Sequence, residues 1–138
     1  MKLKKFSYKK VISTNLTAIR LIRVGKSSGF VTSEIQSKGR GQRGNKWISK
    51  YGNIFISVFF SINQKISIQN ITKKNLNIVK KIIRKYVNKK IEIKRPNDIL
   101  IEKSKVCGIL QETLFRDDLK YLIIGVGINL VNSPHIPN

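Results

Sequence analysis

The alternation of apolar and polar residues divides the chain into segments typical of strands and of helices. A period of three to four in residues 72–89, with Lys and Arg between the apolar positions, predicts an amphipathic helix. A shorter helix is predicted to begin after Ser13 or Thr14, either of which suits an N-cap, and to stop at Gly25. Runs rich in β-branched and aromatic residues predict strands at 6–12, 29–36, 53–62, 91–94, 99–102, 106–115 and 119–130.

The order of these segments indicates the fold class. The predicted helices bracket groups of strands and do not alternate with every strand, so we expect an α+β (mixed α/β) fold. Its sheet should be largely antiparallel or mixed, with the helices packed on one side. The short polar turns EKSK and RDD predict two hairpins. A length of 138 residues suits one domain, so residues 1–138 should form a single unit that ends in the irregular segment NSPHIPN.

The formal net charge of +21 would attract nucleic acid, anionic membranes or acidic proteins. The lysines are nevertheless scattered among Ile and Asn, and no zinc-finger or RNA-recognition motif accompanies them. We therefore interpret most of this charge as tolerant surface substitution, and keep a basic protein that binds RNA or an acidic partner as an alternative. A lone cysteine, Cys107, and the lack of a long apolar run predict a cytoplasmic protein that does not bind membranes.

The segment SKGRGQRGNKW, residues 37–47, is predicted to be an irregular loop that binds an anion. Its glycines let backbone N–H groups approach a phosphate closely, and Arg40 and Arg43 add charged donors. The segment has neither the GxxxxGK[ST] spacing of a Walker A loop nor a GxGxxG motif leading into a helix. Taken alone, a solvated basic turn explains it equally well.

Four motifs occur in a fixed order along the chain: GRGQRGNKW, KRPND, KVCGIL and GVGIN. They resemble the biotin protein ligase pattern, in which GRGRRGxxW, KWPND, KxAGIL and GxGxN follow one another. The resemblance extends from Ser13 to Asn129, about five-sixths of the chain. It implies a class II aminoacyl-tRNA synthetase/biotin ligase-like catalytic domain.

The resemblance also implies a reaction. Biotin and ATP would form biotinyl-5′-AMP, and biotin would pass to a lysine of a biotin carboxyl carrier protein, such as that of acetyl-CoA carboxylase. Mg²⁺ would accompany ATP without fixed protein ligands. The alternative within this superfamily is a lipoate or octanoate ligase or transferase. Because no helix-turn-helix precedes Ser13, we expect no specific DNA binding, and a homodimer is left open. The small C-terminal β-domain of the family is also expected to be lacking.

Site residues follow from the resemblance, position by position. Catalytic roles are implied for Lys105, Asp98 and Arg40. Biotin would be bound by Ser13, Thr14, Asn15, Gln36, Arg40, Gly41, Gln42, Lys105, Gly108 and Leu110. ATP or the adenylate would be bound by Gly39, Arg40, Gln42, Arg43, Trp47, Lys94, Asn97, Gly127 and Asn129, with Gly125 on the same side.

Each assignment has a simpler explanation. Trp47, implied to stack on adenine, would otherwise be a core residue, and Lys105 would be plain surface charge. Residues 96–98 would be an ordinary turn. The chain also departs from the pattern in three places: Gln42 replaces Arg, Arg95 replaces Trp, and Cys107 replaces Ala. We interpret Cys107 as a small core residue and not as a nucleophile, since the only histidine, His135, lies in the terminal segment.

Overall fold

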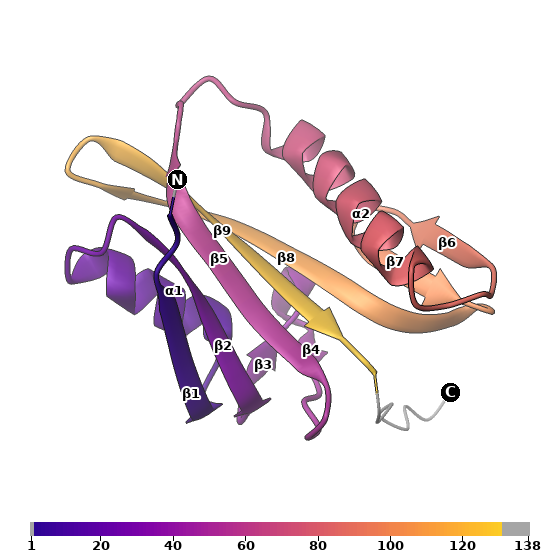
Figure 1. Cartoon of the computed structure of the whole chain (residues 1–138). Coiled ribbons are helices and arrows are strands. Elements are labelled where there is room, and N and C mark those ends of the chain that lie inside the picture. The colour runs from indigo at the N-terminus through magenta and orange to yellow at the C-terminus, as the bar shows by residue number, and fades with distance from the viewer. Residues whose placement is uncertain (1, 131–138) are drawn as a thin grey trace.

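The computed structural model describes residues 2–130, which form a seven-stranded mixed sheet with one helix on each face (Figure 1). The helices are α1 (Thr14–Arg23) and α2 (Ile68–Arg84). The strands run in the order β1-β2-β5-β9-β8-β7-β6, and only β1 and β2 are parallel. Their bounds are β1 (Lys5–Val11), β2 (Ser28–Gln36), β5 (Ile54–Ile62), β6 (Ile91–Lys94), β7 (Asp98–Ile101), β8 (Ser104–Arg116) and β9 (Leu119–Ile128). The expected NSPHIPN segment and His135 lie outside the described residues.

Strands β6 to β9 follow one another as antiparallel neighbours. The turns at Glu102-Lys103 and Asp117-Asp118 have positive φ at both residues, the geometry of type I′ turns that matches the twist of a hairpin. Both predicted hairpins are therefore confirmed. A third hairpin joins β6 to β7, at the place where the sequence predicts only a turn at residues 96–98.

The two faces of the sheet carry separate apolar cores. On β9, Ile123 belongs to the core that contains Ala18 of α1, whereas its neighbour Ile124 packs against the core that contains Leu76 of α2. Successive side chains of a strand point to opposite faces. Helices α1 and α2 therefore cover opposite faces (Figure 1), and the prediction that both pack on one side is wrong. The apolar alternation was right, but it does not say which face each helix covers.

The helix boundaries follow from their caps. Ser13 caps α1, as predicted, by accepting the Leu16 N–H at 3.3 Å, and Gly25 follows the helix with a φ of +99°. Helix α2 begins at Ile68, four residues before the predicted start, because Ser67 accepts the N–H of Asn70. It also ends earlier than predicted. No helix within residues 2–130 has the length and apolar character needed to cross a membrane.

The glycine-rich segment is more regular than predicted. It folds into a short antiparallel ribbon of β3 (Gly39–Arg40) and β4 (Lys46–Trp47), joined by the 3₁₀ turn η1 (Gln42–Gly44). The Gly41 N–H donates to the carbonyl of Asn45 at 2.7 Å and closes the ribbon. The prediction of an irregular loop is therefore wrong for its two ends, because glycine content indicates conformational freedom and does not exclude pairing.

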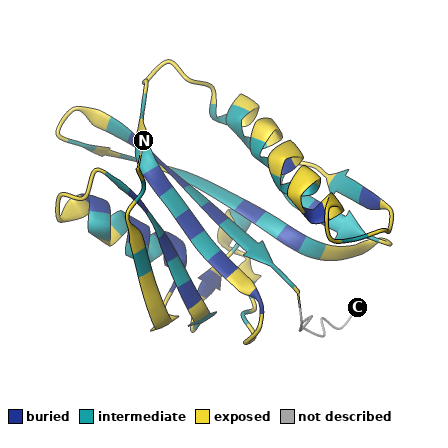
Figure 2. Cartoon of the chain, viewed as in Figure 1, coloured by how far each residue is buried: buried dark blue, intermediate teal, exposed yellow. Residues whose placement is uncertain are grey.

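Burial alternates along β5, where Phe55, Ser57 and Phe59 are buried between less buried neighbours (Figure 2). Phe59 lies in the α1 core, so Ser57 also points toward the α1 face. Ser57 is the polar residue in this buried row. It therefore marks the place where the α1 face changes from apolar core to polar site.

Replacing Leu76 by Ala should lower the free energy of unfolding by about 2–5 kcal/mol, because the side chain is buried between α2 and the sheet. Urea unfolding followed by circular dichroism measures this change. Ile78→Ala on the same helix is the matched control, since Ile78 is 54% exposed. Equal losses in the two variants would contradict the packing described for α2.

Cys107 should not react with iodoacetamide at pH 8 while the chain is folded. Its side chain is fully buried, and burial, with a smaller effect of the Asp98 carboxylate, raises the pKa of the thiol to about 12. The reactive thiolate is therefore scarce at pH 8. Mass spectrometry should find rapid labelling only in guanidinium chloride; rapid labelling of the native chain would contradict the burial.

Candidate active site

A cavity of about 220 Å³ opens on the α1 face of the sheet. Its floor is formed by β8 and β9, and the start of α1, the β3–β4 ribbon and the turn between β6 and β7 line its other sides. The cavity is lined by Ser13, Thr14, Asn15, Gln36, Arg40, Gly41, Gln42, Arg43, Asn45, Lys46, Trp47, Pro96, Asn97, Asp98, Lys105, Gly108, Ile109, Leu110, Gly125, Val126 and Gly127.

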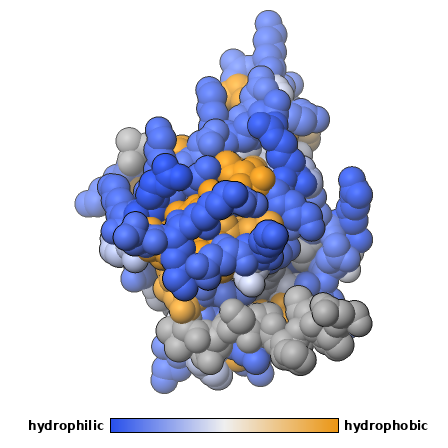
Figure 3. Space-filling model, turned by 90° about the vertical axis from the view of Figure 1, so that its right-hand side faces the viewer, coloured by the Kyte–Doolittle hydropathy of each residue, from blue (hydrophilic) through white to orange (hydrophobic). Residues whose placement is uncertain are grey.

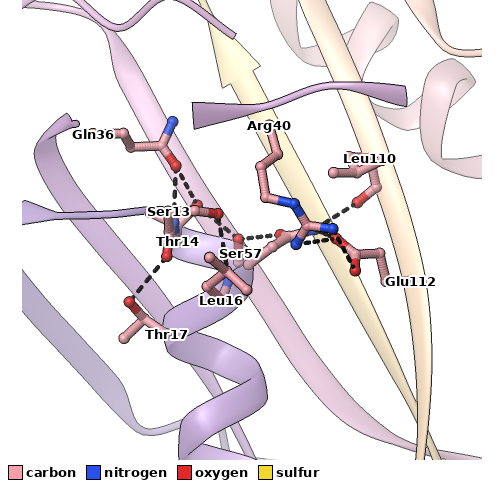
Figure 4. Close-up of polar contacts among 10 residues, drawn as sticks. Ser13, Thr14, Leu16, Thr17, Gln36, Arg40, Ser57, Leu110 and Glu112 are labelled. Carbon is pink, nitrogen blue, oxygen red and sulfur yellow. Dashed lines mark hydrogen bonds and ion pairs between the residues drawn. The ribbon is translucent and has the colours of Figure 1, made fainter. Parts of the chain in front are cut away.

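A buried hydrogen-bond network fixes the start of α1 (Figure 4). Gln36 Oε1 accepts the backbone N–H of Thr14 at 2.8 Å and its hydroxyl at 3.2 Å. The Ser57 hydroxyl lies 2.8 Å from Thr14 Oγ1 and also bonds to Asn15 Oδ1. The Gln36 amide nitrogen donates to Ser49 Oγ at 3.1 Å, beyond β4. Side chains from α1, β2 and β5 therefore hold one another in place at the cavity wall.

Glu112 of β8 connects α1 to the ribbon (Figure 4). Both terminal nitrogens of Arg40 contact its carboxylate. Nη1 lies 3.0 Å from Oε1, and Nη2 donates to Oε2 at 3.2 Å. The carboxylate also accepts the Asn15 amide at 3.1 Å, and the same amide lies 3.2 Å from the carbonyl of Leu110. Arg40 is thereby held against β8 while it lines the cavity.

The floor under the ribbon consists of glycines because Trp47 lies directly on it. Gly108 of β8 pairs with Gly127 of β9. A methyl group on Gly108 would lie 2.8 Å from the indole, and one on Gly127 would lie 2.6 Å from it. Two residues earlier on β9, a methyl group on Gly125 would overlap Asn15. Each of these glycines therefore leaves room for a side chain of the site.

Lys105 and Asp98 form an ion pair at the edge of this floor. Lys105 Nζ lies 3.0 Å from Asp98 Oδ1 and 5.3 Å from the centre of the Trp47 ring. The Lys105 side chain is 45% exposed and that of Asp98 only 17%. The lysine can thus contact a ligand over Trp47 while the carboxylate orients it.

The turn before β7 is fixed by its asparagine. Asn97 Nδ2 donates to the carbonyl of Ile109 at 2.9 Å, and the Ile109 N–H donates to the Asn97 carbonyl at 2.9 Å. These two bonds hold the turn against β8, where Asp98 pairs with Gly108. The simple explanation of residues 96–98 as a turn is correct in part, but the turn also brings Asp98 to the cavity.

The cavity favours anions. Its lining includes four cationic side chains, Arg40, Arg43, Lys46 and Lys105, and one carboxylate, Asp98. Positive charge at a partly enclosed surface attracts carboxylates and phosphates. Residues 2–130 contain no group of three or more His, Cys, Asp or Glu side chains arranged to hold a metal ion.

The structure brings most of the predicted site residues together, including all those expected to bind biotin. Three predicted nucleotide-binding residues do not line the cavity. Gly39 begins β3 and packs closely against the backbone of Trp47, Lys94 ends β6, and the Asn129 side chain accepts from Asn53 at 3.3 Å. The roles of all these residues remain predictions.

Two polar residues of the network were missed from the sequence. The sequence predicts a buried strand around Ser57, and a hydroxyl in an otherwise apolar row is the signal that could have identified this residue. Glu112 lies beyond the GIL motif of β8, so the family motifs do not indicate it. As one of only seven acidic residues in a chain with 28 Lys and Arg, it could have been identified as the partner of a specific cation.

A second cavity, of about 550 Å³, adjoins the first and shares Gln42, Pro96 and Ile109 with it. Arg95, which replaces the Trp of the family pattern, lines this second cavity beside residues of α2. Seen from the right-hand side of the Figure 1 view, most of the surface is hydrophilic around a smaller hydrophobic patch (Figure 3). Helix α2 exposes Ile78 and Ile82.

Comparison with known proteins identifies relatives over most of the chain. Residues 9–129 match the model of the biotin/lipoate A/B protein ligase family. The bifunctional ligase/repressor BirA of Escherichia coli is 34% identical over 121 residues, which are 86% of this chain and 38% of that protein. The chain thus spans well under half the length of this relative.

Solved structures agree with the sequence comparison. Biotin protein ligase from Aquifex aeolicus, in complex with biotin and ATP, superposes with a TM-score of 0.76 at 31% identity, covering 97% of this chain and 55% of that one. Biotin acetyl coenzyme A carboxylase synthetase from Helicobacter pylori superposes with a TM-score of 0.77 over 94% of this chain and 62% of that one. Because it is only 21% identical, this likeness supports the fold alone. The expected fold class is confirmed. The family match over residues 9–129 and the shared fold show that the chain belongs to the biotin/lipoate A/B protein ligase family.

Proposed function

We propose that the chain is a biotin protein ligase core that forms biotinyl-5′-AMP from biotin and ATP and transfers biotin to a lysine of a carrier protein. The observation that carries this proposal is the Lys105–Asp98 pair, which lies beside the glycine floor and next to the Trp47 ring in a cation-lined cavity. The likeness to the Aquifex aeolicus ligase supports the choice of biotin and ATP.

In the first step a biotin carboxylate oxygen attacks the α-phosphorus of ATP, and pyrophosphate leaves with the electron pair of the broken P–O bond. We assign Lys105 to contact both the carboxylate and the α-phosphate, as the family resemblance implies. Its fixed positive charge stabilises the negative charge that builds on the phosphate oxygens. Arg40, held by Glu112, supplies a second cation on the ribbon side.

In the second step the ε-amine of the carrier lysine attacks the carbonyl carbon of biotinyl-AMP, and AMP leaves. The amine loses one proton as the amide forms. Asp98 is the one carboxylate in the cavity lining and is assigned as the acceptor of that proton. Asp98 forms an ion pair with Lys105, so the residues assigned to the first and second steps are direct neighbours.

The ribbon has the task of keeping water from the mixed anhydride, which would otherwise hydrolyse. Arg43 and Gln42 lie at its tip, in the turn η1, and line the cavity. Mg²⁺ is assigned to arrive with the ATP phosphates without a fixed protein ligand, since substrate phosphates and water can supply most of its oxygen ligands. The carrier would be a biotin carboxyl carrier protein, met in the cytoplasm.

Replacing Lys105 by Ala should reduce biotin-dependent pyrophosphate release from ATP by about a hundredfold or more, because a positioned charge at a developing oxyanion is lost. A coupled pyrophosphate assay measures the rate with and without biotin. Lys81→Ala, an exposed change on α2, removes the same charge far from the cavity and should leave the rate unchanged. Equal activity in the two variants would exclude the assigned role of Lys105.

Biotin should outcompete lipoate in this assay, and 0.5 M salt should change biotin binding little because the contacts are short-range. A preference for lipoate would favour the lipoate or octanoate alternative. Binding of RNA or an acidic protein that falls steeply with salt, without any pyrophosphate release, would instead favour the basic binding protein.

Gln42→Arg should slow dissociation of biotinyl-AMP by about tenfold, because it adds a charge-assisted hydrogen bond to the phosphate region. Gln42 lines the cavity where the family pattern has Arg. Release of the adenylate into a trap measures the rate. Gln64→Arg adds the same charge on the exposed segment before α2 and serves as the control. A similar slowing in both variants would mean that general charge, and not this contact, retains the adenylate.

A further inference from the structure

The Glu112 side chain joins the start of α1 to Arg40 of the ribbon. The Arg40 guanidinium and the Asn15 amide converge on its carboxylate, at 3.0–3.2 Å. These two partners come from different walls of the cavity and are separated by 25 positions in the sequence. The carboxylate therefore sets the distance between the two walls.

The contact is made from behind the cavity. Arg40 and Asn15 both line the cavity, whereas Glu112 does not. Its side chain is 22% exposed, on the same face of the sheet as α1. Glu112 therefore holds the two ligand-facing side chains without taking up the space of a ligand.

The geometry of the pair leaves Arg40 available to a ligand. Glu112 uses the two terminal nitrogens of the guanidinium, which still has further N–H donors directed elsewhere. Each terminal nitrogen faces a different carboxylate oxygen, and this two-point contact restricts the direction of the remaining donors. Glutamine at this position would replace one accepting oxygen by an NH₂ group that faces a donor.

We propose that Glu112 is a positioning residue that orients Arg40 and Asn15 for adenylation and holds the ribbon against α1. This proposal rests on the function proposed above for the effect on catalysis, but its effect on the ribbon is independent of any substrate. Glu112 acts through Arg40 and Asn15 and does not itself touch the reacting atoms.

Glu112→Gln should lower kcat/KM for biotin-dependent pyrophosphate release by about tenfold, the size expected when a charge-assisted contact is lost. Glu102→Gln is the matched control. It removes the same charge and a different ion pair, that of Glu102 with Lys89 at 3.5 Å, from a hairpin turn of the same sheet. The control should stay within about twofold of the wild type. Equal rates in the wild type and Glu112→Gln would overturn the proposal.

A double-mutant cycle with Arg40→Ala separates positioning from a general structural effect. If Glu112 acts mainly through Arg40, Glu112→Gln should cost less than about threefold in the Arg40→Ala background, with the thermal unfolding midpoint of each variant reported alongside. A full tenfold loss in that background, accompanied by a lower unfolding midpoint, would show a structural role and overturn the proposal. Glu112→Asp, which keeps the charge with a shorter reach, replaces Glu112→Gln if the latter does not fold.

Trypsin cleavage after Arg43 without substrates tests the ribbon directly. Cleavage should be several-fold faster in Glu112→Gln than in the wild type or Glu102→Gln, because the ribbon is no longer held by Glu112. Unchanged cleavage would overturn the proposal. A wild type that releases no pyrophosphate but shows the difference in cleavage would exclude the proposed function and still support the holding role.

Discussion

The close contact between the Trp47 indole and the backbone of two paired strands is the constraint on which the site depends. Gly108 and Gly127 face each other on β8 and β9, and a methyl group on either would lie within 2.8 Å of the indole. This contact fixes the position of β4 on the sheet. Because β4 pairs with β3, the same contact also fixes how far Arg40 lies from the sheet. Lys105 then lies over the indole, with Asp98 behind it.

Much of the fold could be predicted because strand composition and helix caps are local signals. Ser13 and Gly25 mark the ends of α1, and the polar turns EKSK and RDD correctly predict the two hairpins that contain them. Which face of the sheet α1 and α2 each cover could not be predicted, because an amphipathic pattern defines the apolar side of a helix but not the surface that it packs against. The start of α2 was missed because Ser67 lies before the apolar period becomes clear.

The site was predictable where motifs fix the backbone and less so where partners come from distant strands. The motifs indicated Gly108, Gly127 and Lys105, which the fold brings to one cavity. They could not indicate Glu112, because its partner Arg40 lies 72 positions away and the pairing depends on the tertiary arrangement. Asn129 follows β9, and its side chain accepts from Asn53 without lining the cavity, so its implied role in nucleotide binding stays a prediction.

The chain contains a single tryptophan, Trp47, and this residue lines the cavity, so its fluorescence reports directly on ligand binding there. Titration with biotin, followed by ATP, tests directly whether this cavity binds both substrates. We expect a saturable change in emission with biotin and a further change with ATP that Lys105→Ala weakens. A folded wild-type chain whose emission responds to neither ligand would contradict the proposed function.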